Sequence, residues 1–174
     1  MSRAALVAGI VLGALVAALV LALRAAGKAD APGFIGVGTL LADVNLALEI
    51  LLVLGLTFGM ALARRGNVEA HRINQTAWVL VNAVLVALIM IGSIRTFKIA
   101  HPSDLLHGGN LIIAVHALLG ALTFLSGLWL VLQMNDVLPR ALHVRGWKTL
   151  MRTTLAGYWA VALFGIATYR VWYA

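Results

Sequence analysis

The sequence predicts an all-α integral membrane protein: a five-transmembrane-helix bundle with a four-helix core plus an N-terminal helix. Of its 174 residues, 63% are hydrophobic and only 11% are charged, and the mean hydropathy is +1.01. Soluble domains average about 45–50% apolar and about 25% charged residues. This composition excludes a solvated enzyme, a disordered chain and a soluble solenoid.

Five apolar runs are each long enough to cross a bilayer, because a hydrocarbon core about 30 Å thick needs about 20 helical residues. Backbone groups in lipid must be satisfied within their own segment, so each run is expected to be a helix. The predicted spans lie at about 4–23, 37–62, 73–94, 110–134 and 149–172. The intervening loops are too short for a second domain, so residues 1–174 are predicted to form one membrane domain.

The first run needs to be distinguished from a signal peptide, because the small residues from Ala29 to Ala31 could form a cleavage site. Its apolar stretch of about 20 residues is longer than the usual signal core of about 7–15. Pro32 follows the small residues directly and would hinder cleavage. We therefore expect the first helix to be retained.

Basic residues predict the orientation, because cytoplasmic loops are enriched in Lys and Arg. With five spans, the N-terminus shares one side with the loops at 63–72 and 135–148. That side carries Arg3, Arg64, Arg65, Arg72, Arg140, Arg145, Lys148 and Arg152, and the other carries Arg24, Lys28, Arg95, Lys98 and Arg170. We expect the N-terminus in the cytoplasm and the C-terminus outside.

Several kinds of chemistry are not indicated by the sequence. The chain has no cysteine, which excludes disulfides, thiolate metal sites and thiol catalysis. Its net charge of +7 lies between apolar runs, where it suits lipid head groups rather than nucleic acid. No nucleophile–base pattern or glycine-rich phosphate loop is present. We predict no catalytic residues and no metal site.

Polar side chains inside the spans are costly and are therefore candidates for function. Helix geometry places Glu49 and Asn82 at similar depths near the midplane, and Asn45 lies one turn from Glu49 on the same face. A cluster of these three would provide a proton-accepting carboxylate or a polar contact to a quinone or another cofactor. Alternatively, the three join helices by hydrogen bonds, with a neutral Glu49 carboxyl.

Asp43 and His116 form a second candidate site, because each lies about 9 Å from the outer boundary on its own span. A carboxylate facing an imidazole fixes its tautomer and raises its basicity. Such a pair suits an axial haem ligand, a metal ligand or a proton relay. The alternatives are a structural hydrogen-bonded pair or no contact. His71 and His143 would hold a b-type haem between them if the third and fifth spans adjoin.

A series of polar and basic residues links the second span to the last. It comprises Asp43, Asn45, Arg64, Arg65, His71, Arg72, His116, the basic stretch from Arg140 to Arg152, Gly165 and Tyr169. In this order, residues about 40–173 resemble the YozB/CtaM-like family of small bacterial membrane proteins, which is linked to assembly of haem–copper cytochrome oxidases.

The resemblance implies that Asn45, His71, Arg72 and His116 match residues typical of the family. The family tends to have a histidine near the end of the third span, where Ser93 and Arg95 stand here, and another before the last span, where Trp147 stands. These replacements favour a derived member that kept the scaffold and became a structural or accessory subunit.

The resemblance implies an assembly factor or accessory subunit of a respiratory haem–copper oxidase or related electron-transfer complex. Its partners would be the lipid bilayer and other membrane subunits of that complex. Two alternatives stay open: a redox subunit that binds b-type haem or quinone, and a purely structural subunit without a cofactor.

Overall fold

Five long helices make up most of the chain in the computed structural model, which describes residues 3–92, 101, 103–104 and 109–173. They are α1 (Arg3–Ala25), α2 (Leu40–Arg64), α3 (Val68–Leu85), α5 (Asn110–Met134) and α6 (Trp147–Tyr173). A π-helical turn, η1 (Val86–Met90), continues α3, and a 3-10 turn, η3 (Arg140–Leu142), precedes α6. Among the described residues, five helices are long and apolar enough to cross a membrane. The predicted all-α five-helix fold is confirmed.

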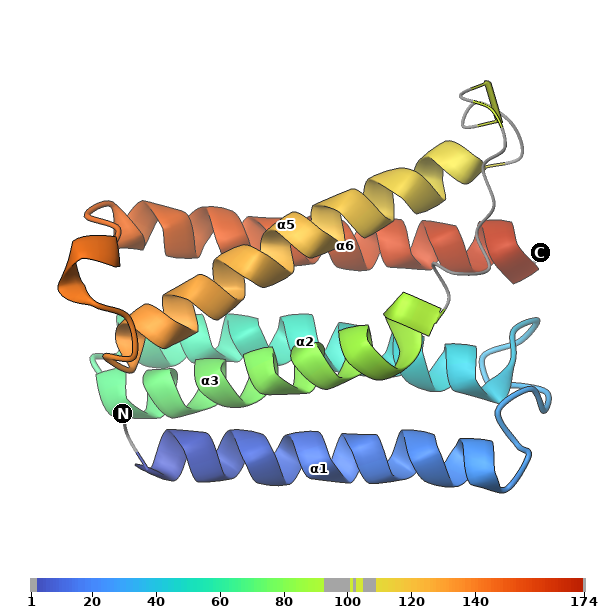
Figure 1. Cartoon of the computed structure of the whole chain (residues 1–174), viewed down its shortest axis with the longest axis horizontal. Coiled ribbons are helices and arrows are strands. Elements are labelled where there is room, and N and C mark those ends of the chain that lie inside the picture. Colours follow the sequence, from blue (N-terminus) through green and yellow to red (C-terminus); the bar gives the residue numbers. More distant parts are fainter. Residues whose placement is uncertain (1–2, 93–100, 102, 105–108, 174) are drawn as a thin grey trace.

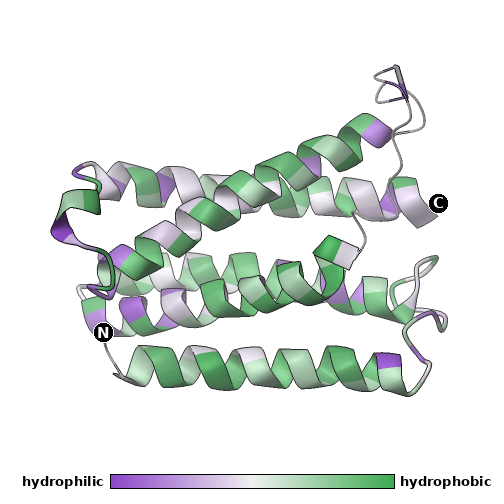
Figure 2. Ribbon diagram, viewed as in Figure 1, coloured by the Kyte–Doolittle hydropathy of each residue, from purple (hydrophilic) through white to green (hydrophobic). Residues whose placement is uncertain are grey.

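Four of the helices form a ring, and the first lies outside it (Figure 1). Within the ring, α2 packs against α3 and α6, and α5 packs against the same two helices. α1 packs against α3, with Gly9 and Gly13 facing Leu80 and Val84. Between Arg3 and Arg24 the residues of α1 are apolar (Figure 2), and many of its large side chains are exposed, as expected for a helix that faces lipid.

Side-chain caps set helix ends that hydropathy located less well. The α2 helix begins at Leu40 rather than at 37 because Thr39 Oγ1 accepts a hydrogen bond from the Ala42 N–H at 3.3 Å. The α3 helix begins at Val68 rather than at 73 because Asn67 Oδ1 accepts one from the Ala70 N–H at 3.1 Å. Capping satisfies the free N–H groups of a first turn even where that turn is polar.

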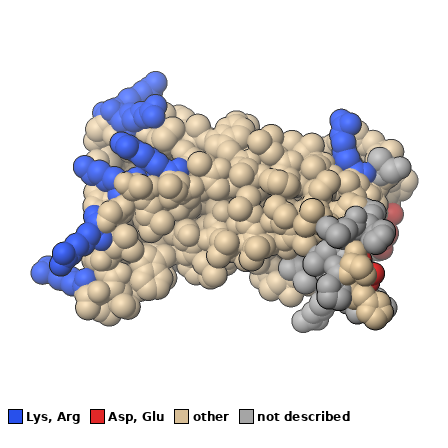
Figure 3. Space-filling view, turned by 90° about the horizontal axis from the view of Figure 1, so that it is seen from above, with Lys and Arg blue, Asp and Glu red and all other residues tan. Residues whose placement is uncertain are grey.

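The predicted end of the third span at 94 lies outside the described residues, as do Ser93, Arg95 and Lys98. Elsewhere, basic side chains gather at the end of the bundle that holds the α2–α3 turn and η3 (Figure 3). The N-terminus lies at this end and the C-terminus at the opposite one (Figure 1). We call the two ends the N-terminal end and the C-terminal end.

The contact between α2 and α3 is close and polar. His71 Nδ1 lies 2.7 Å from the Gly59 carbonyl oxygen, Asn74 Nδ2 donates to the Gly55 oxygen at 2.8 Å, and Gln75 Nε2 donates to the Leu56 oxygen at 3.0 Å. We call this contact the α2–α3 seam. Gly55 and Gly59 allow it, because a Cβ on either would overlap side chains of α3.

The ring is wedge-shaped because α5 crosses it at an angle. Near the N-terminal end α5 meets α3, where Asn135 Nδ2 donates to Thr76 Oγ1 at 3.0 Å. Toward the C-terminal end α5 diverges from α3 and η1 (Figure 1). The π turn widens α3 there, and Arg24 of α1 donates to the Leu88 carbonyl oxygen at 2.7 Å. Such turns leave backbone groups that need outside partners and often lie at functional sites.

Candidate functional site: an intramembrane cavity

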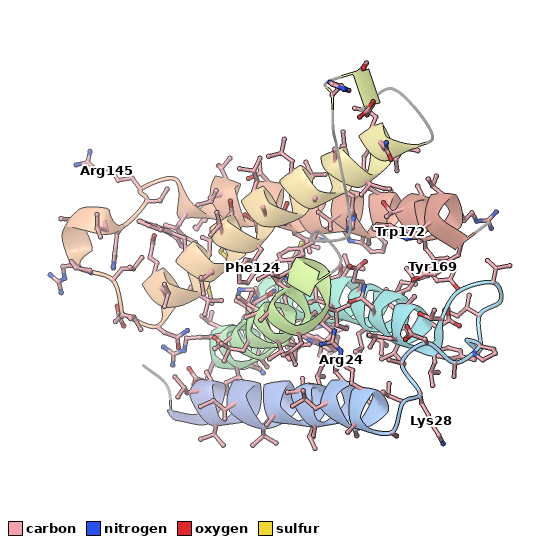
Figure 4. All side chains as sticks on the ribbon, turned by 45° about the vertical axis from the view of Figure 1, so that its right-hand side comes forward. Arg24, Lys28, Phe124, Arg145, Tyr169 and Trp172 are labelled. Atoms are coloured by element: carbon pink, nitrogen blue, oxygen red, sulfur yellow. The ribbon has the colours of Figure 1, made fainter. Side chains whose placement is uncertain are left out.

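A cavity of about 780 Å³ occupies the wide part of the ring. Its walls come from α2, the end of α3 with η1, α5 and α6, and most of its lining residues are apolar. Figure 4 labels Phe124, Tyr169 and Trp172, which line it together with Arg24 of α1. Small-molecule sites are typically clefts of about 300–1,000 Å³ with a few placed polar groups, and this cavity has that character.

Glu49 of α2 and His116 of α5 meet at one point on α6. A Cβ atom built on Gly165 would lie 2.6 Å from Glu49 Oε2 and 3.3 Å from His116 Cε1. A glycine at this position therefore lets a carboxyl group and an imidazole approach the same stretch of backbone. Both side chains also line the cavity.

The hydrogen bond of His116 fixes which of its ring nitrogens is available. Its Nδ1 lies 3.1 Å from the Val161 carbonyl oxygen, so Nδ1 carries a proton and donates. In the neutral ring, Nε2 is then the acceptor. Within the described part of the chain, Glu49 has one hydrogen bond, a long one of 3.5 Å from Asn45 Nδ2. The pair thus offers an acceptor nitrogen and a carboxyl group with spare bonding capacity.

The predicted cluster of Asn45, Glu49 and Asn82 is partly assembled, since all three residues line the cavity. Asn45 bonds to Glu49, but Asn82 Nδ2 donates instead to the Tyr158 hydroxyl at 3.2 Å. This bond joins α3 to α6 across the interior of the ring. It forms the floor of the cavity together with the buried side chains of Leu52 and Ala162.

The structure does not bring Asp43 to His116: both are described, and neither a hydrogen bond nor an ion pair joins them. Asp43 is fully buried and accepts hydrogen bonds from the Ile35 N–H and the Tyr169 hydroxyl. The Tyr169 oxygen in turn accepts from the Gly38 N–H at 3.0 Å. Because Ile35 lies in the α1–α2 loop and Tyr169 lies on α6, Asp43 links that loop to α6 by hydrogen bonds. Glu49 takes the place beside His116 that was predicted for Asp43.

His71 and His143 lie away from the cavity, and each has a backbone partner. His71 belongs to the α2–α3 seam and is buried. His143 follows η3 and places Nε2 3.0 Å from the Leu138 carbonyl oxygen. α3 and α6 do meet, through the Asn82–Tyr158 hydrogen bond. His71 and His143, however, are each bonded to a backbone oxygen of a different segment rather than paired with each other, as a haem held between them would require. Within the described ranges, no group of three or more His, Asp or Glu side chains is arranged to hold a metal ion.

Three residues of the site were not predicted from the sequence as cavity residues. Gly165 and Tyr169 entered only as part of the family resemblance, and Tyr158 was not singled out. A usable signal was the position of Tyr158 inside the apolar run rather than at its end, because a hydroxyl there needs a partner. The contacts of Gly165 and Tyr169 depend on how α6 packs, which spacing along one helix does not reveal.

Comparison with known proteins adds no relative: no protein-family model, no curated protein and no solved structure matches the chain.

Proposed function

We propose that this membrane protein binds a lipid-soluble molecule of the quinone class in the cavity, with the oxygen-bearing head between Glu49 and His116. One observation carries the proposal: a carboxyl and an imidazole from two helices converge on Gly165 inside a cavity whose other walls are mostly apolar. This combination of a polar end and an apolar body matches an amphiphile with a hydrogen-bonding head.

The two polar groups suit both states of a quinone. A protonated Glu49 carboxyl donates to a quinone carbonyl, and His116 Nε2 accepts from a quinol hydroxyl. The hydrocarbon tail would lie along the divergence between η1 and α5, against Ile89 and Phe124, where the wall is apolar. Quinone is favoured over b-type haem because, among the described residues, His116 is the one histidine that lines the cavity.

Binding is tested on the purified protein in lipid nanodiscs with decylubiquinone and a photoactivatable azidoquinone. We expect saturable binding, with crosslinks to peptides of α2 or α5. His116→Leu and Glu49→Leu should each weaken binding about tenfold, which corresponds to about 1.4 kcal/mol, because each removes a hydrogen bond to the head. His143→Leu and Glu69→Gln are matched controls outside the cavity and should bind as the original chain does.

Gly165→Ala is the sharpest variant, because its methyl group would occupy the space between Glu49 and His116. It should weaken quinone binding while leaving the fold intact, since the Glu49 side chain can move into the cavity. Absent or unsaturable binding would contradict the proposal and favour a purely structural subunit. A Soret band that shifts on reduction and is lost in His116→Ala would favour haem instead.

The wider setting is also a proposal: an assembly factor or accessory subunit of a respiratory haem–copper oxidase in a bacterial cytoplasmic membrane. It is supported by Asn45 and His116, two of the four residues matched in the family resemblance, which both line the cavity. The cationic N-terminal end supports a cytoplasmic N-terminus (Figure 3). Reduced oxidase activity on deletion, with the chain absent from mature oxidase, would support assembly. Co-purification with oxidase subunits would support an accessory subunit.

A further inference from the structure

We infer that the cavity is a one-sided aqueous vestibule, through which Glu49 exchanges protons with the compartment on the C-terminal side. This inference concerns the same cavity as the proposed function but does not require a quinone. It rests on three observations: where the polar lining residues lie, what closes the opposite end, and which buried polar atoms lack a protein partner.

The lining becomes polar toward the C-terminal end. Arg24, Asp30 and Thr39 line the cavity close to the α1–α2 loop, and Tyr173 lines it from the end of α6. These residues mark a mouth at the level where membrane proteins meet water. Glu49 lies deeper on the same wall, with Asn45 one helical turn closer to the mouth.

Toward the N-terminal end the ring is closed by direct packing. The Asn82–Tyr158 hydrogen bond crosses it, and Leu52, Leu56 and Ala162 form a buried cluster with the Tyr158 ring. The α5 and α6 helices are also close at this level, because a Cβ on Gly157 would lie 2.7 Å from Thr123 Oγ1. Water entering from the mouth would therefore reach Glu49 but would go no further toward the N-terminal end.

Two polar atoms on the C-terminal side of the cavity are buried without a hydrogen-bond partner among the described residues. They are Asn45 Oδ1 and Thr168 Oγ1, which belong to residues that line the cavity. Buried polar groups are almost always bonded to protein or to water, so a small shift would let both bond to cavity water. Such water needs two to four polar neighbours, and Asn45, Thr168 and the Glu49 carboxyl supply them.

Proton exchange needs no further reactant. The Glu49 carboxyl transfers its proton to a cavity water, giving a carboxylate and a hydronium ion, and takes a proton back by the reverse step. The groups around it are His116 on α5, Tyr158 on α6 and Asn82 on α3, with Arg24 and Asp30 at the mouth. Glu49 exchanges protons with one side only because the floor of the cavity is closed, and not because of the charges of these groups.

Single-cysteine labelling tests the inference directly, because the natural chain has no cysteine. Glu49→Cys, Asn45→Cys and Thr168→Cys are made singly in sealed vesicles of known orientation. A charged, membrane-impermeant methanethiosulfonate is then added to one side at a time. Leu118→Cys is the control at the depth of His116, since Leu118 is 64% exposed on the outer surface of α5. Thr154→Cys reports from beyond the floor. Thr154 Oγ1 is also buried without a partner among the described residues but does not line the cavity, so this variant would detect water on the far side of the floor.

We expect the three cavity cysteines to be labelled from the C-terminal side only, with Leu118→Cys and Thr154→Cys unlabelled from both sides. If Glu49→Cys does not fold, the other two cavity variants carry the test. Labelling from the N-terminal side, or cavity cysteines no more reactive than Leu118→Cys, would overturn the inference, as would labelling of Thr154→Cys. Failure of quinone binding would leave this labelling pattern unchanged, so the two proposals fail separately.

Discussion

Along the α2–α3 seam, three side chains of α3 are each paired with a carbonyl group of α2, and the helices approach closely at Gly55 and Gly59. Across the cavity, and counting only the described residues, Glu49 has one long hydrogen bond and Asn45 Oδ1 has no partner. Both regions hold costly polar groups within the spans. In the seam these groups hold two helices together, as small-residue interfaces in membranes commonly do. Unpaired atoms alone do not separate the two regions, because His71 Nε2 in the seam also lacks a partner among the described residues. In the cavity, Glu49 and Asn45 have spare bonding capacity and also line an open volume, and this combination is what suggests a ligand.

The largest effect on stability is expected at Gly55, in the α2–α3 seam. A methyl group there would overlap the indole of Trp78, a rigid ring held between α2 and the buried core. Gly55→Ala should lower the free energy of unfolding by about 3 kcal/mol, because close-packed interfaces respond poorly to added volume. Reversible unfolding in mixed micelles measures this change.

Gly120→Ala is the matched control on the cavity wall. The nearest side-chain atom would lie 3.9 Å from its new Cβ, in ordinary contact. Alanine favours a helix over glycine by about 1 kcal/mol, so this variant should be as stable as the original chain or more so. Equal losses for the two variants would mean that the cavity is packed as tightly as the seam.

The loop contact at Asp43 should show the second largest effect. Asp43→Ala removes the acceptor of both the Ile35 N–H and the Tyr169 hydroxyl. We expect a loss of about 2 kcal/mol, because donors left without a partner in a buried position are costly. Proteolysis or amide exchange in the loop before α2 should increase in parallel. Asp30→Ala, an exposed acid of the same loop, should change neither.

Hydropathy and chain length predicted the five spans, since each needs only a long apolar run, and for α5 even the bounds 110–134 match. Helical rise also placed Glu49 and Asn82 at similar depths, and both line the cavity. The same argument matched His116 in depth with Asp43, so its actual neighbour, Glu49, could not be anticipated. Asp43 and Glu49 lie on the same helix, and the rotation of α2 against α5 decides which of them approaches the ring. That rotation is set by the seam and by Gly165, which are contacts between helices that one sequence does not reveal.

Two asparagines allow the seam and the cavity to be compared with identical chemistry. Asn74→Ala removes a 2.8 Å hydrogen bond to the Gly55 oxygen and should cost about 1 kcal/mol, in the range measured for such bonds between membrane helices. Asn45→Ala removes only the 3.5 Å contact with Glu49 and should leave stability nearly unchanged. Unfolding measurements on both variants under the same conditions make the comparison. A larger loss of unfolding free energy for Asn45→Ala than for Asn74→Ala would mean that Asn45 stabilises the bundle rather than serving a ligand.

Among the hydrogen bonds between helices that are tested, the smallest loss is expected at Trp159, which is 41% exposed on α6 and donates to Thr57 Oγ1 at 3.1 Å. Thr57 Oγ1 itself donates to the Val53 carbonyl oxygen at 2.7 Å, so the threonine hydroxyl keeps this hydrogen bond in Trp159→Phe. The expected loss is therefore about 0.5 kcal/mol, below that for Asn74→Ala, measured by the same unfolding method. If the two losses were equal, a hydrogen bond on the exposed side of the bundle would stabilise it as much as one in the seam. Close helix approach at Gly55 and Gly59 would then not make the hydrogen bonds of the seam stronger than those elsewhere in the bundle.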